Sequence, residues 1–270
     1  MAANAQQAFE GRGMPVALVS GATRGVGRGI AVSLGEAGWT VWATGRSSRA
    51  AGSTSHLPGN VEETAEAVSS AGGTGVPWRC DHTDEGSVKG LARAIGERHG
   101  ALDLLVNNTW AGYERLNAGA WEEWKAPFYD QPLELFDAMI TSGIRSHYVT
   151  TALCAGLLMA APAALVVTVS FGGEGPVGYV VSKAADDRLA VVLGAAFRSG
   201  DVVSVGLHPG LVRTEGVVQF QEYLDFSASQ SPEGVGRVVA ALAADPGRRR
   251  FNGQVLEVAA LADEFGVSLA

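Results

Sequence analysis

The 270-residue sequence is poor in cysteine, and its two cysteines are not arranged for a disulfide framework or a metal site. Cys80 and Cys154 stand far apart and form no CxxC pair, and the five histidines show no metal-ligand spacing. Structural disulfides and a zinc site are therefore not expected, and the cysteine usage fits a reducing, cytoplasmic environment.

Basic residues are in deficit, because 20 Lys and Arg stand against 28 Asp and Glu and give a net charge of −8. No basic face is evident in the sequence, so nucleic acid is not the expected partner. The beginning of the chain lacks the basic start and the long apolar run of a signal peptide. Residues 1–13 are therefore interpreted as a flexible tail.

Long uncharged runs are rare, and the one exception extends from Tyr148 to Gly173, which is long enough to cross a bilayer. Pro162 interrupts this run, and a proline is not tolerated cheaply inside a helix. Ala, Gly and Leu dominate before Pro162, whereas "ALVVTVS" after it is rich in β-branched residues. We interpret the run as a packed helix followed by a buried strand of a soluble protein, not as a membrane span.

What the chain has in abundance is apolar residues, at 47%, and 36 glycines. Short β-branched runs alternate strictly with helical patterns. The expected strands are 15–21, 39–45, 75–81, 102–108, 163–170, 202–210 and 253–259. The expected helices are 27–38, 61–73, 85–100, 132–159, 179–197 and 231–246. This order predicts an α/β fold with a doubly wound, seven-stranded parallel sheet, helices on both faces and ligands at the carboxyl ends of the strands.

One domain is expected over residues 14–270. Two irregular segments interrupt its rhythm, at 113–131 and 211–230. Both follow strands, at the end of the sheet where ligands bind, and long loops in compact domains commonly carry function. They are interpreted as substrate-side insertions that form walls and a lid.

A glycine-rich turn, "SGATRGVGRG", follows the first expected strand. Gly21, Gly25 and Gly27 allow a sharp turn and a close approach to a pyrophosphate at the start of the next helix. Thr23, Arg24 and Val26 stand between these glycines and belong to the same predicted cofactor site. Arg24 could stack on adenine or add positive charge.

The end of the second strand bears on the choice between NAD and NADP. An acidic residue usually stands here in enzymes that bind NAD, whereas this chain has Gly45 followed by Arg46. A guanidinium at this place can pair with a 2′-phosphate. NADP(H) is therefore the expected cofactor and NAD(H) a possible one, and the alternative is that Arg46 and Arg49 are only loop cations.

These motifs, taken together and in this order, resemble the short-chain dehydrogenase/reductase family over Met14 to Ala259. The matching runs are "GATRGVG", "CDHTD", "NN", "YVVSK" and "HPGLVRT". "NNTWAGYE", "RSHY" and "PGLVRTE" are similar to the subgroup of dehydrogenase/reductase family member 1. The resemblance implies a Rossmann-like NAD(P)-binding domain. It also implies cofactor contacts from Asp81 to adenine, from Asn107 to the ribose side, from Thr214 to the nicotinamide amide, and from Pro209, Gly210 and Val212 beside it.

The stretch "GYVVSKAADD" places Tyr179 and Lys183 at positions i and i+4, on one face of a helix. A free phenol has a pKa of about 10, and lowering this to about 7 takes roughly 4 kcal/mol. One ammonium at about 4 Å, at an effective dielectric constant of about 20, supplies roughly that. Tyr179 is therefore the expected general acid/base, and Lys183 its partner and a holder of the nicotinamide ribose.

The chain departs from the family pattern at two catalytic positions. Ser170 ends the fifth strand where the family has the first of two serines, and Phe171 stands at the second position, which is usually the catalytic one. Ser170 either takes that role across a shortened loop or only ends the strand. Thr141 occupies the position of an Asn that the family uses to hold a water for proton relay, and its hydroxyl is the expected substitute.

Aromatic residues gather around the same region. Trp110 replaces a small residue of the family pattern, and Tyr113, Trp121 and Trp124 follow it. They either shape an apolar substrate pocket or pack the insertion.

The expected activity is hydride transfer between NADPH and a carbonyl or secondary alcohol of a small aromatic or alicyclic molecule. The alternative is a catalytically impaired, cofactor-binding regulator with the same fold. A homodimer or homotetramer is expected from the family, with the uncharged "TALCAGLLMAA" at the interface or in the core.

Overall fold

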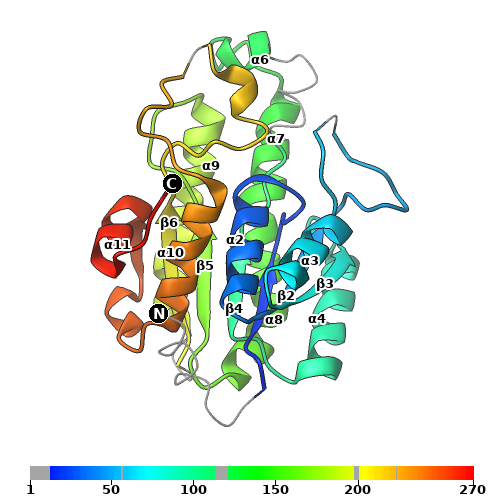
Figure 1. The fold of residues 1–270 in the computed structure, drawn as a ribbon. Coiled ribbons are helices and arrows are strands. Elements are labelled where there is room, and N and C mark those ends of the chain that lie inside the picture. The colour runs from blue at the N-terminus through cyan, green and yellow to red at the C-terminus, as the bar shows by residue number, and fades with distance from the viewer. Residues whose placement is uncertain (1–12, 56, 113–120, 198–200, 223) are drawn as a thin grey trace.

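The computed structural model describes residues 13–55, 57–112, 121–197, 201–222 and 224–270 (Figure 1). The expected tail thus lies almost wholly outside the described residues, as do positions 113–120 of the first expected insertion.

Seven parallel strands form one sheet in the order β3-β2-β1-β4-β5-β6-β7. Their bounds are β1 Val16–Val19, β2 Thr40–Gly45, β3 Thr74–Arg79, β4 Leu104–Asn107, β5 Leu165–Val169, β6 Val203–His208 and β7 Gln254–Glu257. The predicted doubly wound parallel sheet is confirmed. The strand order reverses between β1 and β4, and in such sheets the crevice at the reversal point is where ligands bind.

Helices cover both faces of the sheet (Figure 1). One layer contains α2 (Gly25–Glu36), α3 (Val61–Ser70), α10 (Pro232–Ala244) and α11 (Val258–Phe265). The other contains α4 (Glu85–His99), α8 (Ser146–Ala160) and α9 (Val177–Ala196). Alternate residues of β1 divide between the two layers, because Ala17 and Val19 join the first core cluster and Val16 and Leu18 join the second. Strands buried on both faces read as continuous apolar runs, as the sequence does.

The long helix expected over 132–159 is interrupted. It divides into α7 (Leu133–Ile140), a π-helical turn η1 (Thr141–Arg145) and α8. Gly143 has φ −90° and ψ −108°, outside the helical region. Serine hydroxyls bond to carbonyls in this turn, since Ser142 Oγ donates to Ala138 O at 2.5 Å and Ser146 Oγ lies 2.6 Å from Ser142 O. Side chains that bond to the backbone in this way bend helices.

The structure also contains short helices and turns that the sequence did not predict. The helix α6 (Trp121–Lys125) lies within the first irregular segment and the 3₁₀ turn η2 (Val218–Phe220) within the second. A further 3₁₀ turn, η3 (Arg248–Phe251), precedes β7, and α11 follows it. Figure 1 shows α6, α7, the 211–230 segment and the loop after β2 at one end of the molecule, which is the carboxyl end of the strands.

The uncharged run is resolved as α8 followed by β5, as predicted. Among the described residues, none of the helices has the length and apolar character needed to span a bilayer.

The close contact between α2 and α10 generates a stability prediction. A Cβ at Gly29 would lie 2.2 Å from the backbone carbon of Pro232, so Gly29→Ala forces the helices apart. We expect the free energy of unfolding to fall by about 1–3 kcal/mol, as for other overpacked sites. The control is Gly90→Ala in α4, where a Cβ would meet nothing within 4 Å, and which should raise stability by about 0.5–1 kcal/mol. Urea denaturation measures both, and a Gly29→Ala protein as stable as the parent contradicts the prediction.

Candidate active site

A cavity of about 440 Å³ opens at the carboxyl end of the sheet. It is walled by the β1–α2 turn, by residues that follow β2 to β6, and by the 211–230 segment. Most of the predicted site residues line it: Gly21, Thr23, Arg24, Gly25, Val26, Arg46, Asp81, Ser170, Tyr179, Lys183, Pro209, Gly210, Val212 and Thr214. Residues from across the whole chain therefore meet in one crevice, at the point where the strand order reverses.

Three predicted residues lie outside the lining of this cavity. Gly27 is packed behind it, since a Cβ there would lie 2.4 Å from the carbonyl oxygen of Gly21. Asn107 is buried and donates to Thr151 Oγ1 at 2.9 Å, on α8. Thr141 is exposed, and its neighbour Ser142 lines the cavity instead.

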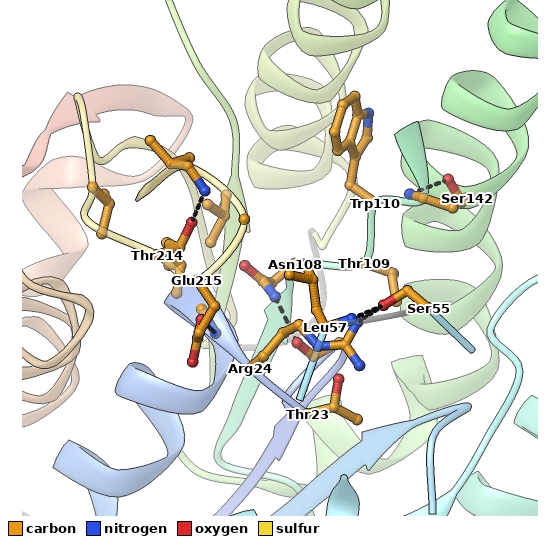
Figure 2. A pocket seen from close by; sticks show the side chains of 18 of the residues that line it. Thr23, Arg24, Ser55, Leu57, Asn108, Thr109, Trp110, Ser142, Thr214 and Glu215 are labelled. Atoms are coloured by element: carbon orange, nitrogen blue, oxygen red, sulfur yellow. Dashed lines mark hydrogen bonds between the residues drawn. The ribbon is translucent and has the colours of Figure 1, made fainter. Parts of the chain in front are cut away.

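The glycine-rich turn adopts a conformation that glycine favours. Gly21 has φ +67° and Gly25 has φ +57°, both in the left-handed region. Asn108, which lines the cavity, donates from Nδ2 to the carbonyl oxygens of Ser20 and Gly21, each at 3.1 Å. The end of β4 thereby fixes the shape of the turn (Figure 2).

The start of α2 already binds an anionic group of the chain itself. The N–H of Gly25 donates to the Glu215 carboxylate, Oε2, at 2.9 Å. Helix N-termini favour negative charge because their first N–H groups lack helical partners. The turn therefore fits a pyrophosphate, and Glu215, on the 211–230 segment, occupies the place of an anion there.

Cationic and hydroxyl groups surround the part of the cavity after β2. The guanidinium of Arg24 donates to Ser55 Oγ at 2.9 Å and to the carbonyl oxygen of Pro58 at 2.9 Å (Figure 2). Arg46 lines the same region with the hydroxyl residues Ser47, Thr54 and Ser55. This donor set suits a phosphate monoester.

Space at the end of β2 is restricted by the side chain of Thr23. A Cβ at Gly45 would lie 2.7 Å from Thr23 Cγ2, so a larger residue here requires the Thr23 side chain to shift. Arg49 does not join the site, because its guanidinium forms a bidentate ion pair with Glu66 on α3. Both N–H···O distances are 2.6 Å. Arg46 and Arg49 therefore differ in their surroundings, although the sequence presents them as similar loop cations.

Asp81 stands at the end of β3, where the resemblance expects a contact to adenine. Its Oδ1 accepts from the Thr83 N–H at 2.9 Å and from Thr83 Oγ1 at 2.7 Å. Partial burial opposes ionisation, but these bonds and the charge of Arg46 hold the pKa of the Asp81 carboxyl below its ordinary value. A charged acceptor therefore faces the cavity near the hydroxyl-rich region.

Tyr179 and Lys183 share the face of α9 that borders the cavity, as the i, i+4 spacing predicted. The Lys183 side chain is buried, with Nζ 3.5 Å from the carbonyl oxygen of Val169. The phenol ring is surrounded by other rings, whose centroids lie 5.4 Å away for Trp110, 5.5 Å for Trp124 and 5.7 Å for Phe171. Of the aromatic residues considered above, Trp110 and Trp124 thus reach the site, whereas Tyr113 and the side chain of Trp121 lie outside the described part of the chain.

Trp110 fits because its neighbour Gly112 has no side chain. A Cβ at Gly112 would lie 2.2 Å from the indole, whereas one at Gly143 would lie 3.6 Å from it, at an ordinary contact distance. Ser142, in the π-helical turn, accepts the Ala111 N–H at 2.8 Å (Figure 2). The interruption of the long helix therefore accompanies a bulky residue where the family pattern has a small one.

The Ser170 hydroxyl lines the cavity but is engaged elsewhere. It is buried and donates to the carbonyl oxygen of Lys183 at 2.8 Å. A serine has one hydroxyl hydrogen, so this bond must break before Ser170 can donate to another group.

Sequence reasoning missed several lining residues. Ser47, Thr54 and Ser55 belong to the run "SSRAAGSTS", whose density of hydroxyls was an available signal. Ser142 and Glu215 gave no comparable signal, because each depends on a turn whose path only the fold determines.

The fold and the crevice define a dinucleotide-binding oxidoreductase of the Rossmann type. Residues 15–224 match the model of the short chain dehydrogenase family. The chain is 37% identical to mouse dehydrogenase/reductase SDR family member 1, over 93% of this chain and 82% of that protein. The human protein of that name is 35% identical over the same shares. A putative dehydrogenase from Xanthomonas campestris has a similar structure, with a TM-score of 0.80 and 25% identity over 94% of this chain and 90% of that one.

The chain therefore belongs to the short-chain dehydrogenase/reductase family, as its motifs predicted. It is an NAD(P)-dependent oxidoreductase. A short chain dehydrogenase from Shigella flexneri, solved in complex with NADP, has the same fold, with a TM-score of 0.75 and 19% identity over 93% of this chain and 99% of that one.

The two arginines after β2 generate a prediction about cofactor choice. Arg46→Ala should weaken NADPH binding by roughly 10- to 100-fold, the range for loss of one charge-assisted contact, and leave NADH binding nearly unchanged. Arg49→Ala removes the same charge three positions away, outside the cavity lining, and should alter neither affinity. Fluorescence titration of both reduced cofactors measures the effect. Equal losses for NADPH and NADH in the Arg46 variant would refute a contact to the 2′-phosphate.

Proposed function

We propose that the chain is an NADPH-dependent oxidoreductase that transfers hydride to or from the carbonyl or secondary alcohol carbon of a small aromatic or alicyclic molecule. The observation that carries the proposal is the placing of Tyr179 and Lys183 together at the wall of the cavity, beside the glycine-rich turn. The bound cofactor would supply or accept the hydride.

The preference for NADPH is supported by the surroundings of Arg46. Arg24 and the hydroxyls of Ser47, Thr54 and Ser55 share this region of the cavity. Gly45 stands where an acid would hold a free ribose 2′-hydroxyl, and a Cβ there would press on the Thr23 side chain. Charge and hydrogen-bond donors together favour a phosphate at this place.

Tyr179 is the proposed acid/base. In reduction its hydroxyl gives a proton to the carbonyl oxygen, and in oxidation its phenolate takes the proton from the alcohol. The ammonium of Lys183 favours the phenolate and holds the nicotinamide ribose. The centroid of the Trp110 ring lies 5.9 Å from Lys183 Nζ, and the rings of Trp124 and Phe171 also lie against Tyr179.

The substrate class follows from these rings. Trp110, Trp124 and Phe171 form an apolar wall around the Tyr179 hydroxyl. A flat ring of a substrate can stack against such aromatic faces. Leu211, Val217, Phe220 and Leu224 add apolar lining from the 211–230 segment. A ring-bearing ketone or secondary alcohol matches this wall, with its oxygen directed at Tyr179.

The test of the acid/base assignment is Tyr179→Phe, which keeps the ring and its packing. We expect the rate to fall by about 10²- to 10⁴-fold, the usual contribution of a general acid. NADPH affinity should change little. The rate of NADPH oxidation is measured against a panel of ketones, aldehydes and quinones, with Tyr148→Phe, an exposed tyrosine on α8, as the control. Retained activity in the Tyr179 variant would contradict the assignment of Tyr179 as the general acid/base.

Ser170 is the proposed second donor to the substrate oxygen. Its hydroxyl would turn from the Lys183 carbonyl toward the cavity as negative charge develops on that oxygen. Ser170→Ala should then lower the rate by about 10²-fold, in line with the loss of one such donor.

The matched control is Ser204→Ala in β6. Ser204 Oγ donates to the carbonyl oxygen of Ala190 at 3.0 Å, so it also ties a strand to α9, but far from the cavity lining. If both variants keep the parental rate, Ser170 serves only to fasten β5 to α9.

A cofactor-binding regulator is the second candidate. Phe171 stands at the position where the family has its catalytic serine, and the hydroxyl of the preceding Ser170 is engaged by a backbone carbonyl. Thr141, at the position of the family's relay Asn, is exposed. These departures favour the regulator. Tight NADPH binding with no turnover of any compound in the panel would support the regulator and contradict the enzyme.

A further inference from the structure

A buried carboxylate stands directly behind Lys183. Asp186, one turn further along α9, is fully buried and does not line the cavity. Its Oδ2 lies 3.5 Å from Lys183 Nζ, and its Oδ1 lies 2.8 Å from Nδ1 of His147, on α8. Charges buried this deeply are costly unless they are paired, so the arrangement requires an explanation. Nothing in the proposed contacts to cofactor or substrate uses it.

His147 bonds only to acceptors. Its Nε2 lies 3.0 Å from the carbonyl oxygen of Thr109, and its Nδ1 faces the Asp186 carboxylate. Neither oxygen can donate a hydrogen, so satisfying both requires a proton on each ring nitrogen. The two acceptors therefore favour the imidazolium form of His147. Burial and the charge of His147 lower the pKa of the neighbouring His82 to about 4, and the negative charge of Asp81 opposes this shift.

Three charges thus lie in a row inside the protein, with Lys183 positive, Asp186 negative and His147 positive. Burial opposes ionisation of Asp186, but the two cations hold the pKa of its carboxyl below its ordinary value. A carboxylate alone beside Lys183 would largely cancel the field that the ammonium exerts on Tyr179. The imidazolium cancels the carboxylate instead, so one net positive charge remains behind the phenol.

We propose that Asp186 and His147 are positioning residues for the Tyr179–Lys183 pair. Asp186 fixes the Lys183 ammonium at the cavity wall, and His147 neutralises Asp186 so that the ammonium still favours the Tyr179 phenolate. The inference deepens the proposed function and rests on it. It gives Lys183 a support from α8, in a chain whose Thr141 faces away from the cavity.

Other ionisable groups border the cavity and set the baseline of the Tyr179 titration. Among the described residues they are Arg24, Arg46, Asp81, His82, Glu174 and Glu215. Cys80 is also there, but burial raises the pKa of its thiol to about 11 and keeps it neutral. Because these groups are the same in every variant below, differences between variants report on the row of three charges.

The experiment titrates the phenol of Tyr179 by tyrosinate absorbance, as the difference between each protein and the same protein with Tyr179→Phe. Asp186→Asn removes a negative charge and should lower the midpoint. His147→Asn removes a positive charge and should raise it. Each shift should be roughly 0.5–1 pH unit, for one charge at several ångströms and an effective dielectric constant of about 20. The double variant should return close to the parental midpoint.

Opposite shifts distinguish the proposal from a purely structural role. If Asp186 and His147 only support the fold, both variants loosen Lys183. The Tyr179 midpoint then moves upward in both, toward the pKa of an ordinary phenol. That result overturns the proposal, as does a midpoint near the ordinary value of about 10 in the parent and in every variant. If His147→Asn does not fold, Asp186→Asn alone decides, because a raised or unchanged midpoint overturns the proposal and a lowered one supports it.

The matched control is Asp187→Asn, the next residue on α9. Asp187 also pairs with a histidine, His208, at 3.0 Å, and it lies outside the cavity lining. Its variant should not move the midpoint. The titration needs no substrate, so its outcome is separate from the turnover panel. Opposite shifts without turnover would support the roles of Asp186 and His147 and contradict the proposed enzymatic activity. Turnover without opposite shifts would support the activity and contradict those roles.

Discussion

The contact between the end of β4 and the β1–α2 turn is the interaction on which the site depends. The Asn108 amide holds the carbonyl oxygens of Ser20 and Gly21, and the hydroxyl of Ser20 accepts the Asn108 N–H at 2.9 Å. A Cβ at Gly27 would lie 2.5 Å from that amide, so the contact also requires glycine on the facing helix. Because β1 and β4 are neighbours where the strand order reverses, this small group of atoms joins the two halves of the sheet and directs the start of α2 into the crevice.

The other walls are built outward from this point, and they show how the chain accommodates departures from its family. Trp110 follows the same strand end and brings an indole to Tyr179. Room for it comes from Gly112, and the indole lies against the π-helical turn at Gly143, where serine hydroxyls bond to the backbone carbonyls. A large side chain, a missing Cβ and a π-helical turn are thus parts of one packing arrangement, although they are spread over more than thirty positions of the sequence.

Electrostatics divide the cavity into two regions. Cations and hydroxyls after β2 suit a phosphate, and the start of α2 attracts negative charge strongly enough to bind Glu215 in its place. Around Tyr179 the lining is aromatic, and the charges that act on the phenol are buried behind it in α8 and α9. Burial strengthens their effect, because a medium of low dielectric constant screens charges less than water does. The same burial makes each of them costly unless its neighbour is present.

The sequence by itself determined the parallel sheet, the helices on both its faces, the family and the spacing of Tyr179 and Lys183, because these follow from local periodicity and from contiguous motifs. It did not reveal the break in the long helix, since the helical pattern of apolar residues continues through Gly143. Nor did it distinguish Asn107 from Asn108, because adjacent residues with the same side chain differ only in the direction that the backbone imposes. The pairing of Asp186 with His147 was decided by tertiary structure alone. The two residues are far apart in the chain, and the packing of α9 against η1 and α7, which carries the start of α8 to Asp186, excludes the water that would otherwise screen the pair.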